Sequence, residues 1–189
     1  RASLFQADLS DPSAAAALGE RVIADFGALD VLVPSAANFE DVALEDIDDG
    51  HWERALMLNL RAPFELARAA APALRSSEGA IVFITGFGTE VPYTGFLPYL
   101  ASKGALRQVM RTLALELAPD VRVNAVAPGT VLPPDDMSEE ATEALVSKAP
   151  LRRVGAASDI AEAVAYLASA PYVTGQQLLV DGGRSVAAT

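Results

Sequence analysis

Cysteine is absent from this chain of 189 residues, and histidine occurs once. Without cysteine there is no disulfide framework and no thiolate metal ligand. Because structural and catalytic metal sites draw mainly on Cys, His and carboxylates, one histidine and no cysteine lead us to expect no metal. A cysteine-free composition also suits a reducing compartment, and we expect a cytoplasmic protein.

Positive charge and long hydrophobic runs are also scarce. Lys and Arg total 14 against 25 Asp and Glu, so the formal net charge is −11. Nucleic-acid binding needs clustered Lys and Arg, and we therefore expect no nucleic-acid partner. No apolar run approaches the roughly 18 residues that mark a membrane-spanning helix, so we expect no membrane partner. The acidic runs "EDIDDG" and "PPDDMSEE" are most simply read as solvated loops and helix starts.

Short apolar segments alternate with longer helical patterns along the chain. Nearly continuous apolar strands of this kind are typical of a parallel sheet with helices on both faces. We therefore predict a single α/β domain over residues 1–189, and the hydrophobic content of 51% is enough for one core. The predicted strands are 3–8, 29–34, 79–85, 121–127 and 177–182, and the predicted helices are 10–27, 49–75, 98–118 and 158–170.

One motif of dinucleotide-binding folds is missing. Such folds open with a glycine-rich strand-to-helix turn, which lets a pyrophosphate approach the backbone. The "GFG" at 86–88 follows a strand but opens no helix at the required spacing. The chain therefore either binds no dinucleotide or lacks the first strand–helix unit of such a fold.

Tyr99 and Lys103 are four residues apart in the predicted helix 98–118, so they share one helical face. A nearby ammonium favours the phenolate form of a tyrosine, so Lys103 should lower the pKa of Tyr99 and make it a tuned general acid. The small residues Ser102, Gly104 and Ala105 leave space beside the pair for a substrate and a flat cofactor. The structural alternative is a packed ring beside a surface lysine.

Asn59 lies inside the long predicted helix 49–75, where asparagine is unfavourable by helix propensity. Pro63, four residues later, has no N–H to donate to the Asn59 carbonyl, so the helix should bend there and leave that oxygen free. A free carbonyl of this kind can hold a water against an ammonium such as that of Lys103. The structural alternative is a kinked helix with a solvated asparagine.

Three segments together resemble the short-chain dehydrogenase/reductase family: "YLASK" at 99–103, "RTLALELAPDVRVNAVAPGTV" at 111–131 and "YVTGQQLLVDGG" at 172–183. The resemblance covers essentially the whole chain. It implies a Rossmann-type, doubly wound parallel sheet in a three-layer α/β/α arrangement. It also implies an NAD(P)-dependent oxidoreductase with Tyr99, Lys103 and Asn59 as catalytic residues.

The resemblance further implies where the cofactor binds. Besides Tyr99 and Lys103, it assigns cofactor contacts to Asp8 and Leu9 beside the adenine and to Pro128, Gly129 and Thr130 beside the nicotinamide. Ser35, Ala36 and Ala37 stand in the family's "NNAG" turn, which reads Pro34-Ser35-Ala36-Ala37 here. Without the family, Asp8 would be an ordinary strand-end residue.

The family also explains the missing glycine-rich turn. Its sheet has the strand order 3-2-1-4-5-6-7, and the sequence in hand begins at the third of these strands. The first two strands would lie between segments 3–8 and 29–34 in the middle of the sheet. We therefore expect this sequence to be the N-terminally incomplete record of a longer protein.

Two positions bear on the substrate. The segments "LVPSAANFEDV" and "APGTVLPPDDM" are similar to the pteridine reductase branch, where Phe39 matches the phenylalanine that stacks on the pterin. Gly86, thirteen residues before Tyr99, stands where most of the family has a catalytic serine and many pterin reducers have a carboxylate. Alternatively, Phe39 is a loop aromatic at the edge of the core.

The resulting prediction is a reductase that transfers hydride to a small flat heterocycle, most simply a dihydropteridine. NADPH is the expected cofactor, with NADH as the alternative. A generic carbonyl reductase or alcohol dehydrogenase is the second hypothesis, and a cofactor-binding member with weakened catalysis is the third. The family's members commonly pair through the helices that match 64–74 and 104–118 here, so we also expect a homotetramer.

Overall fold

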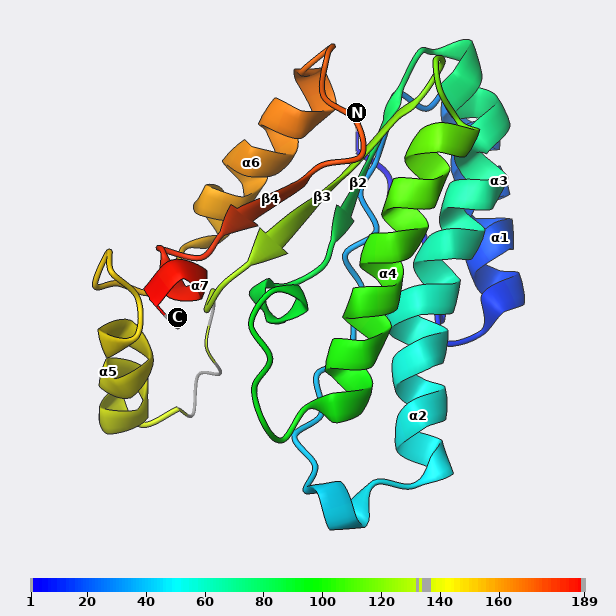
Figure 1. Cartoon of the computed structure of the whole chain (residues 1–189). Helices are drawn as coiled ribbons and strands as arrows, with labels where there is room; N and C mark the ends of the chain where they lie inside the picture. The colour runs from blue at the N-terminus through cyan, green and yellow to red at the C-terminus, as the bar shows by residue number, and fades with distance from the viewer. Residues whose placement is uncertain (1, 132, 134–136, 188–189) are drawn as a thin grey trace.

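The computed structural model describes residues 2–131, 133 and 137–187, and within these residues four parallel strands form one sheet (Figure 1). The strands are β1 (Val31–Leu32), β2 (Ala80–Ile84), β3 (Arg122–Pro128) and β4 (Gln177–Val180), in the spatial order β1-β2-β3-β4. Each neighbouring pair is parallel. The predicted Rossmann-type α/β architecture is therefore confirmed.

Helices cover both faces of this sheet (Figure 1). On one side lie α1 (Pro12–Phe26), α2 (Asp49–Leu56), α3 (Ala62–Ser76) and α4 (Leu97–Glu116), and on the other lies α6 (Ala157–Ser169). The shorter helices α5 (Glu139–Ser147) and α7 (Arg184–Ala187) lie near the carboxyl ends of β3 and β4. None of the described helices is both long and apolar enough to cross a membrane.

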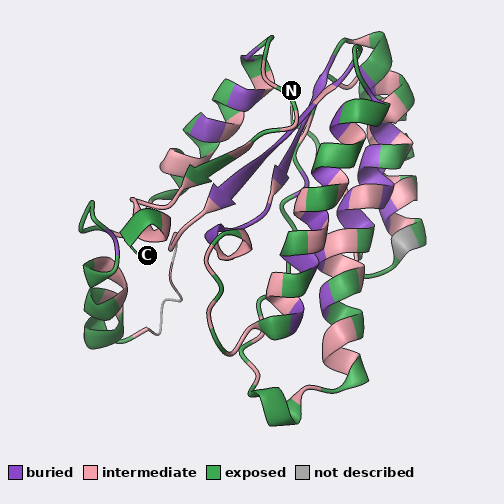
Figure 2. Ribbon diagram, in the orientation of Figure 1, coloured by how far each residue is buried: buried purple, intermediate pink, exposed green. Residues whose placement is uncertain are grey.

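Figure 2 shows β2 and β3 buried along nearly their whole length, and strand alternation divides the core around them into two layers. Ile81 and Phe83 of β2 point toward α3 and α4, where they join a buried cluster that includes Met110. Val82, between them in the sequence, points to the opposite face and packs with Leu167 of α6. Nearly every residue of β2 and β3 is therefore buried, which is why these strands read as continuous apolar runs.

The predicted helix 49–75 is two α-helices joined by a π-helical turn, η2 (Met57–Arg61). The N–H of Ala62 bonds to the carbonyl of Met57, five residues back, instead of four. Pro63 follows immediately and cannot donate to the Asn59 carbonyl. The irregularity thus lies where the proline predicts a bend.

Two expectations about secondary structure are wrong. Residues 3–8 form no strand, because no described strand lies beside them to complete a hydrogen-bonded ladder. The strand predicted over 29–34 is only β1, two residues long, since β2 is its one neighbour in the described sheet. The helix α5 begins at Glu139 inside the acidic run "PPDDMSEE", where a helix start was expected, and Ser138 caps its first turn. Its extent to Ser147 was not among the predicted helices.

Candidate active site

Most of the predicted site residues gather at the carboxyl edge of the sheet, because parallel strands all end on one side. The loop of Ser35, Ala36 and Ala37 follows β1, Gly86 follows β2, and Gly129 follows β3. The first turns of α4 lie against the same edge and supply Tyr99 and Lys103.

Lys103 is a buried cation, with 4% of its surface exposed. Its Nζ donates a hydrogen bond of 2.9 Å to the carbonyl of Ile84 at the end of β2. The same Nζ lies 5.9 Å from the centre of the Tyr99 ring. A surface lysine that keeps its charge in water is therefore excluded, and the ammonium lies behind the tyrosine.

Burial changes the acidity of both groups. It lowers the pKa of Lys103 to about 8, because an ammonium is poorly solvated there. Burial also raises the pKa of Tyr99 above its ordinary value, and Tyr93 adds to that rise. The expected lowering of the Tyr99 pKa by Lys103 is thus wrong for the protein without a cofactor, because desolvation dominates. Tyr99 is consequently a fully protonated phenol at neutral pH.

Asn59 connects three segments that are distant in the sequence. Its side-chain oxygen accepts a 2.8 Å bond from the Asn38 N–H, and its amide donates to the Asn38 carbonyl and to Ser102 Oγ, each at 3.1 Å. Ser102 Oγ in turn donates to the Tyr99 carbonyl at 2.7 Å. Asn59 is 0% exposed, so the alternative of a solvated asparagine is excluded. Its side chain holds the loop after β1 against the helix that carries Tyr99.

Gly86 faces the tyrosine hydroxyl. A Cβ built on this glycine would lie 3.2 Å from Tyr99 Oη, and its φ of 173° is an extended conformation open to any residue. The Thr85 hydroxyl instead donates to Gln177 Oε1 at 2.8 Å on the other side of the strand. The Thr85 side chain therefore points away from Tyr99, as strand alternation requires, and does not replace the missing serine.

Phe39 lies beside Tyr99 with 60% of its surface exposed. Its ring stacks on Phe96 at 4.2 Å between centroids and meets the Tyr99 ring edge-on at 4.8 Å. An aromatic at the core edge would be largely covered, so Phe39 belongs to the wall of the site and not to the core.

Asp8 and Leu9 lie apart from this group, at the turn that leads into α1. Asp8 Oδ1 accepts bonds from the N–H and the hydroxyl of Ser10, at 2.9 and 2.7 Å, and these bonds lower the pKa of Asp8. Leu9 packs on the small cluster around Ala15. The structure therefore gives both residues a role in the local turn, and their adenine contacts stay a prediction.

Pro128, Gly129 and Thr130 form the end of β3 and the start of the next loop. A Cβ on Gly129 would lie 2.6 Å from the Cα of Asp181, closer than real Cβ atoms approach, so only glycine fits beside the end of β4. Thr130 Oγ1 accepts a 2.6 Å bond from Arg184.

Sequence reasoning missed Asn38 and Phe96. Asn38 pairs through its backbone with Asn59, and its own Oδ1 is buried without a hydrogen-bond partner in the described residues. Neither residue belongs to a periodic pattern or a known spacing. The one available signal was their position, since each lies within three residues of Phe39 or Tyr99.

Comparisons with known proteins agree with this fold. A family model described as enoyl-(acyl carrier protein) reductase matches residues 1–185. The chain is 37% identical to Nodulation protein G of Rhizobium sp. (strain N33), over 97% of this chain and 77% of that protein. It is 36% identical to 3-oxoacyl-[acyl-carrier-protein] reductase FabG of Staphylococcus aureus (strain Mu50 / ATCC 700699), over 95% and 75%. A crystal structure of a putative short-chain alcohol dehydrogenase from Sinorhizobium meliloti 1021 superposes with a TM-score of 0.92 at 32% identity, covering 98% of this chain and 77% of that one.

This chain belongs to the short-chain dehydrogenase/reductase family. It is accordingly an NAD(P)-dependent oxidoreductase. No match specifies the pteridine reductase branch, so that part of the resemblance stays a hypothesis.

The buried ammonium fits the nicotinamide end of such a cofactor. An ammonium has three donors, and among the described residues Lys103 has one acceptor, the Ile84 carbonyl. Two donors are left for oxygens from outside the chain, such as ribose hydroxyls. Lys103 is therefore the residue that would hold the ribose, beside Tyr99.

The depressed pKa of Lys103 predicts a pH-dependent stability. The unfolded chain has a lysine pKa of about 10.4, so between pH 8 and about 10.4 the unfolded state binds more protons than the folded state. The free energy of unfolding should therefore rise over this range, as the cost of the buried charge disappears. The comparison is urea unfolding of the wild type and of Lys103→Met, which has no charge to bury. The amount by which the variant's free energy of unfolding exceeds that of the wild type should shrink between pH 7 and pH 10. A difference that is constant with pH would contradict a buried, charged Lys103.

Tyr99→Phe tests the proton donor. The Tyr99 hydroxyl bonds to no group in the described part of the chain, so the variant should fold with unchanged stability. Its turnover should fall by about 10²-fold or more, because the general acid is lost. The matched control is Tyr93→Phe, which removes a neighbouring hydroxyl and should keep most activity. Equal turnover of Tyr99→Phe and wild type would refute the role of Tyr99.

Proposed function

We propose that this protein is an NADPH-dependent carbonyl reductase of the cytoplasm, acting on a small ketone, with NADH as the alternative cofactor. The observation that carries the proposal is the protonated Tyr99 hydroxyl, which faces Gly86 at 3.2 Å from where a Cβ would stand and has Lys103 behind its ring. A phenol with a raised pKa stays protonated until it donates, which suits reduction. The similarity to a 3-oxoacyl reductase supports a carbonyl substrate.

The residues divide the work between them. When bound, the nicotinamide supplies the hydride. Tyr99 Oη donates the proton to the substrate's carbonyl oxygen, and Lys103 stabilises the phenolate that remains. Asn59 keeps the Phe39 loop at a fixed distance from α4 through its bonds to Asn38 and Ser102. Its backbone carbonyl, to which Pro63 cannot donate a hydrogen bond, is the proposed anchor of a water that replaces the proton Lys103 passes to the Tyr99 phenolate, so that both groups regain their protons.

Gly86→Ser tests the carbonyl assignment. The space opposite Tyr99 Oη lacks the hydroxyl that would donate a second hydrogen bond to a carbonyl oxygen. Serine there should raise kcat/KM for a ketone by about tenfold, or about 1.4 kcal/mol. Gly86→Ala, which adds the Cβ without the hydroxyl, is the control and should give no gain. If both variants lose activity equally, Gly86 provides space for the substrate and the missing-donor account is wrong.

A second candidate is reduction of a dihydropteridine, which the exposed ring of Phe39 favours. One face of this ring stacks on Phe96, the ring meets that of Tyr99 edge-on, and 60% of the residue is exposed. A flat heterocycle could stack there, and a ring nitrogen needs a serine hydroxyl less than a ketone does. Under this reading, Gly86→Asp is the improving change, because a carboxylate can hold the polar edge of the pterin.

Phe39→Ala separates the two candidates. If Phe39 stacks on a pterin, the variant should raise the KM for dihydrobiopterin by several-fold more than the KM for a small ketone, since stacking contributes about 1 kcal/mol beyond burial. The measurement is steady-state kinetics with both substrates on the same preparation. Equal changes would remove the pterin hypothesis, and a wild type that turns over neither substrate would favour a member with weakened catalysis.

We also propose a homotetramer, for which the outer face of α4 is the support. Ala101 and Gly104 are exposed there, and Leu115 is 81% exposed. Light scattering at micromolar concentration should give four times the chain mass of 19.7 kDa. Leu115→Glu should reduce that mass, because it places a charge in the contact, whereas Glu116→Gln should not. A monomeric wild type would contradict the assembly.

A further inference from the structure

A cavity of about 200 Å³ adjoins the candidate active site at η3 (Phe87–Thr89). Its wall includes Phe87, Val91 and Tyr93 on one side and Lys148 and Arg184 on the other. Phe87 follows Gly86 directly in the chain, so the cavity begins one residue from the space opposite Tyr99 Oη.

Aromatic rings connect this cavity to the catalytic tyrosine. Phe87 stacks on Tyr93 at 5.3 Å, and Tyr93 meets Phe96 at 5.5 Å. Phe96 in turn stacks on Phe39, which contacts Tyr99. These contacts form a continuous row of aromatic rings from the cavity to Tyr99.

The charge of the cavity is opposite to that of the chain. The chain carries a net charge of −11, yet the described residues that line the cavity include two cations and no carboxylate. Within the described residues neither Lys148 nor Arg184 forms an ion pair. An anion repelled by the molecule as a whole would find its compensating charges here.

Arg184 is held in place without being neutralised. Its guanidinium donates a 2.6 Å bond to Thr130 Oγ1, and its Cζ lies 4.3 Å above the centre of the Phe87 ring. A guanidinium has five N–H donors in a fixed plane, so most of them stay available for a planar or tetrahedral anion.

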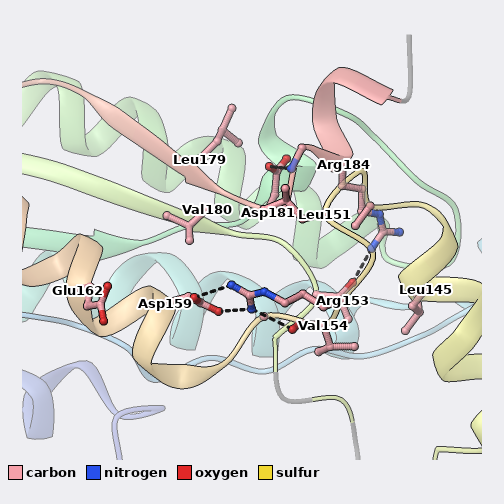
Figure 3. A pocket seen from close by; sticks show the side chains of 15 residues that line it. Leu145, Leu151, Arg153, Val154, Asp159, Glu162, Leu179, Val180, Asp181 and Arg184 are labelled. Carbon is pink, nitrogen blue, oxygen red and sulfur yellow. Dashed lines mark hydrogen bonds and ion pairs between the residues drawn. The ribbon is translucent and has the colours of Figure 1, made fainter.

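A larger neighbouring cavity of about 390 Å³, which Arg184 also lines, provides the contrast (Figure 3). There Arg153 bonds to both carboxylate oxygens of Asp159, at 2.7 and 2.8 Å, and Glu162 and Asp181 add further negative charge. Figure 3 shows the Arg153 guanidinium turned to Asp159 and the Arg184 guanidinium turned away from it. The positive charge of Arg153 is therefore neutralised by Asp159, whereas that of Arg184 is paired with no carboxylate of the described residues.

We infer that the 200 Å³ cavity binds an anionic group of the substrate, so that the substrate is a carbonyl compound carrying a carboxylate or phosphate several bonds from the carbonyl. This inference rests on the proposed carbonyl reductase function. Arg184 would bind two anion oxygens with its fork, and Lys148 would add a second, more mobile charge.

The test compares charged and neutral substrates of equal length. The wild type should reduce 5-oxohexanoate with a higher kcat/KM than its methyl ester, and 5-oxohexyl phosphate distinguishes phosphate from carboxylate preference. In Arg184→Gln the acid-to-ester ratio should fall about tenfold or more, through KM, with the ester unaffected. Lys148→Gln should lower the ratio by less, and the control Arg153→Gln should leave it unchanged.

A binding measurement separates this inference from the proposed function. Calorimetry should detect hexanoate binding to the wild type, and Arg184→Gln should weaken it by a similar factor. Two results for Arg184→Gln would overturn the anion site while leaving carbonyl reduction intact. One is an unchanged acid-to-ester ratio of kcat/KM, and the other is a higher KM for NADPH with no effect on reduction of the acid. If Arg184→Gln loses activity on the ester as well, the acid-to-ester ratio of Lys148→Gln becomes the test, because the exposed Lys148 side chain is not needed for folding. A lowered ratio supports the anion site, and an unchanged ratio overturns it. Failure of every ketone with retained hexanoate binding would instead overturn the proposed function.

Discussion

The hydrogen bond from Lys103 to the Ile84 carbonyl is the contact on which the site depends. It joins the start of α4 to the last residue of β2, and therefore sets where Tyr99 lies relative to Gly86. Burying the ammonium that makes this bond also costs free energy. A buried ammonium loses much of its hydration, and one neutral carbonyl offsets only part of that loss. The Lys103 ammonium thus keeps hydrogen-bond donors free for oxygens that a bound cofactor would provide.

Asn59 supplies the second constraint, and it works by satisfying backbone groups instead of charges. Its amide pairs with both the N–H and the carbonyl of Asn38, much as a neighbouring strand would. The loop after β1 can consequently be irregular while its polar groups stay bonded. Lys103 and Asn59 together hold Tyr99 between the end of β2, the loop after β1 and the bent helix.

Local chemistry explains which features could be predicted from the sequence. Tyr99 and Lys103 were identified by a spacing of one helical turn, and Asn59 by its conflict with helix propensity and with Pro63. The predicted direction of the shift in the Tyr99 pKa was wrong, because the spacing of Tyr99 and Lys103 indicates a neighbouring charge but not how deeply the tyrosine is buried. The strand over 3–8 was wrong because a strand needs a partner that apolar content does not reveal.

Arg184 and Lys148 were not identified for a different reason. They come from separate segments, 36 positions apart, and meet only because α5 and α7 lie at the same end of the sheet. Nothing in their own neighbourhoods distinguishes them from the solvated cations common on any surface. Residues that meet only in the folded structure, with no local sequence pattern, cannot be identified from a single sequence.

The π-helical turn has a consequence for how the long helix tolerates change in length. Ala55 and Leu74 are both buried and lie 19 residues apart, whereas five turns of α-helix take about 18. The wider turn absorbs the extra residue, and so the inward faces of α2 and α3 stay aligned. A one-residue deletion within 57–61 would reduce this spacing to about 18, the value for five turns, and would favour a regular helix with the same faces inward. Leu66, Ala70 and Leu74 would then stay in the core, so the extra residue of the π-helical turn is not needed for core packing and its effect is confined to the segment around Asn59.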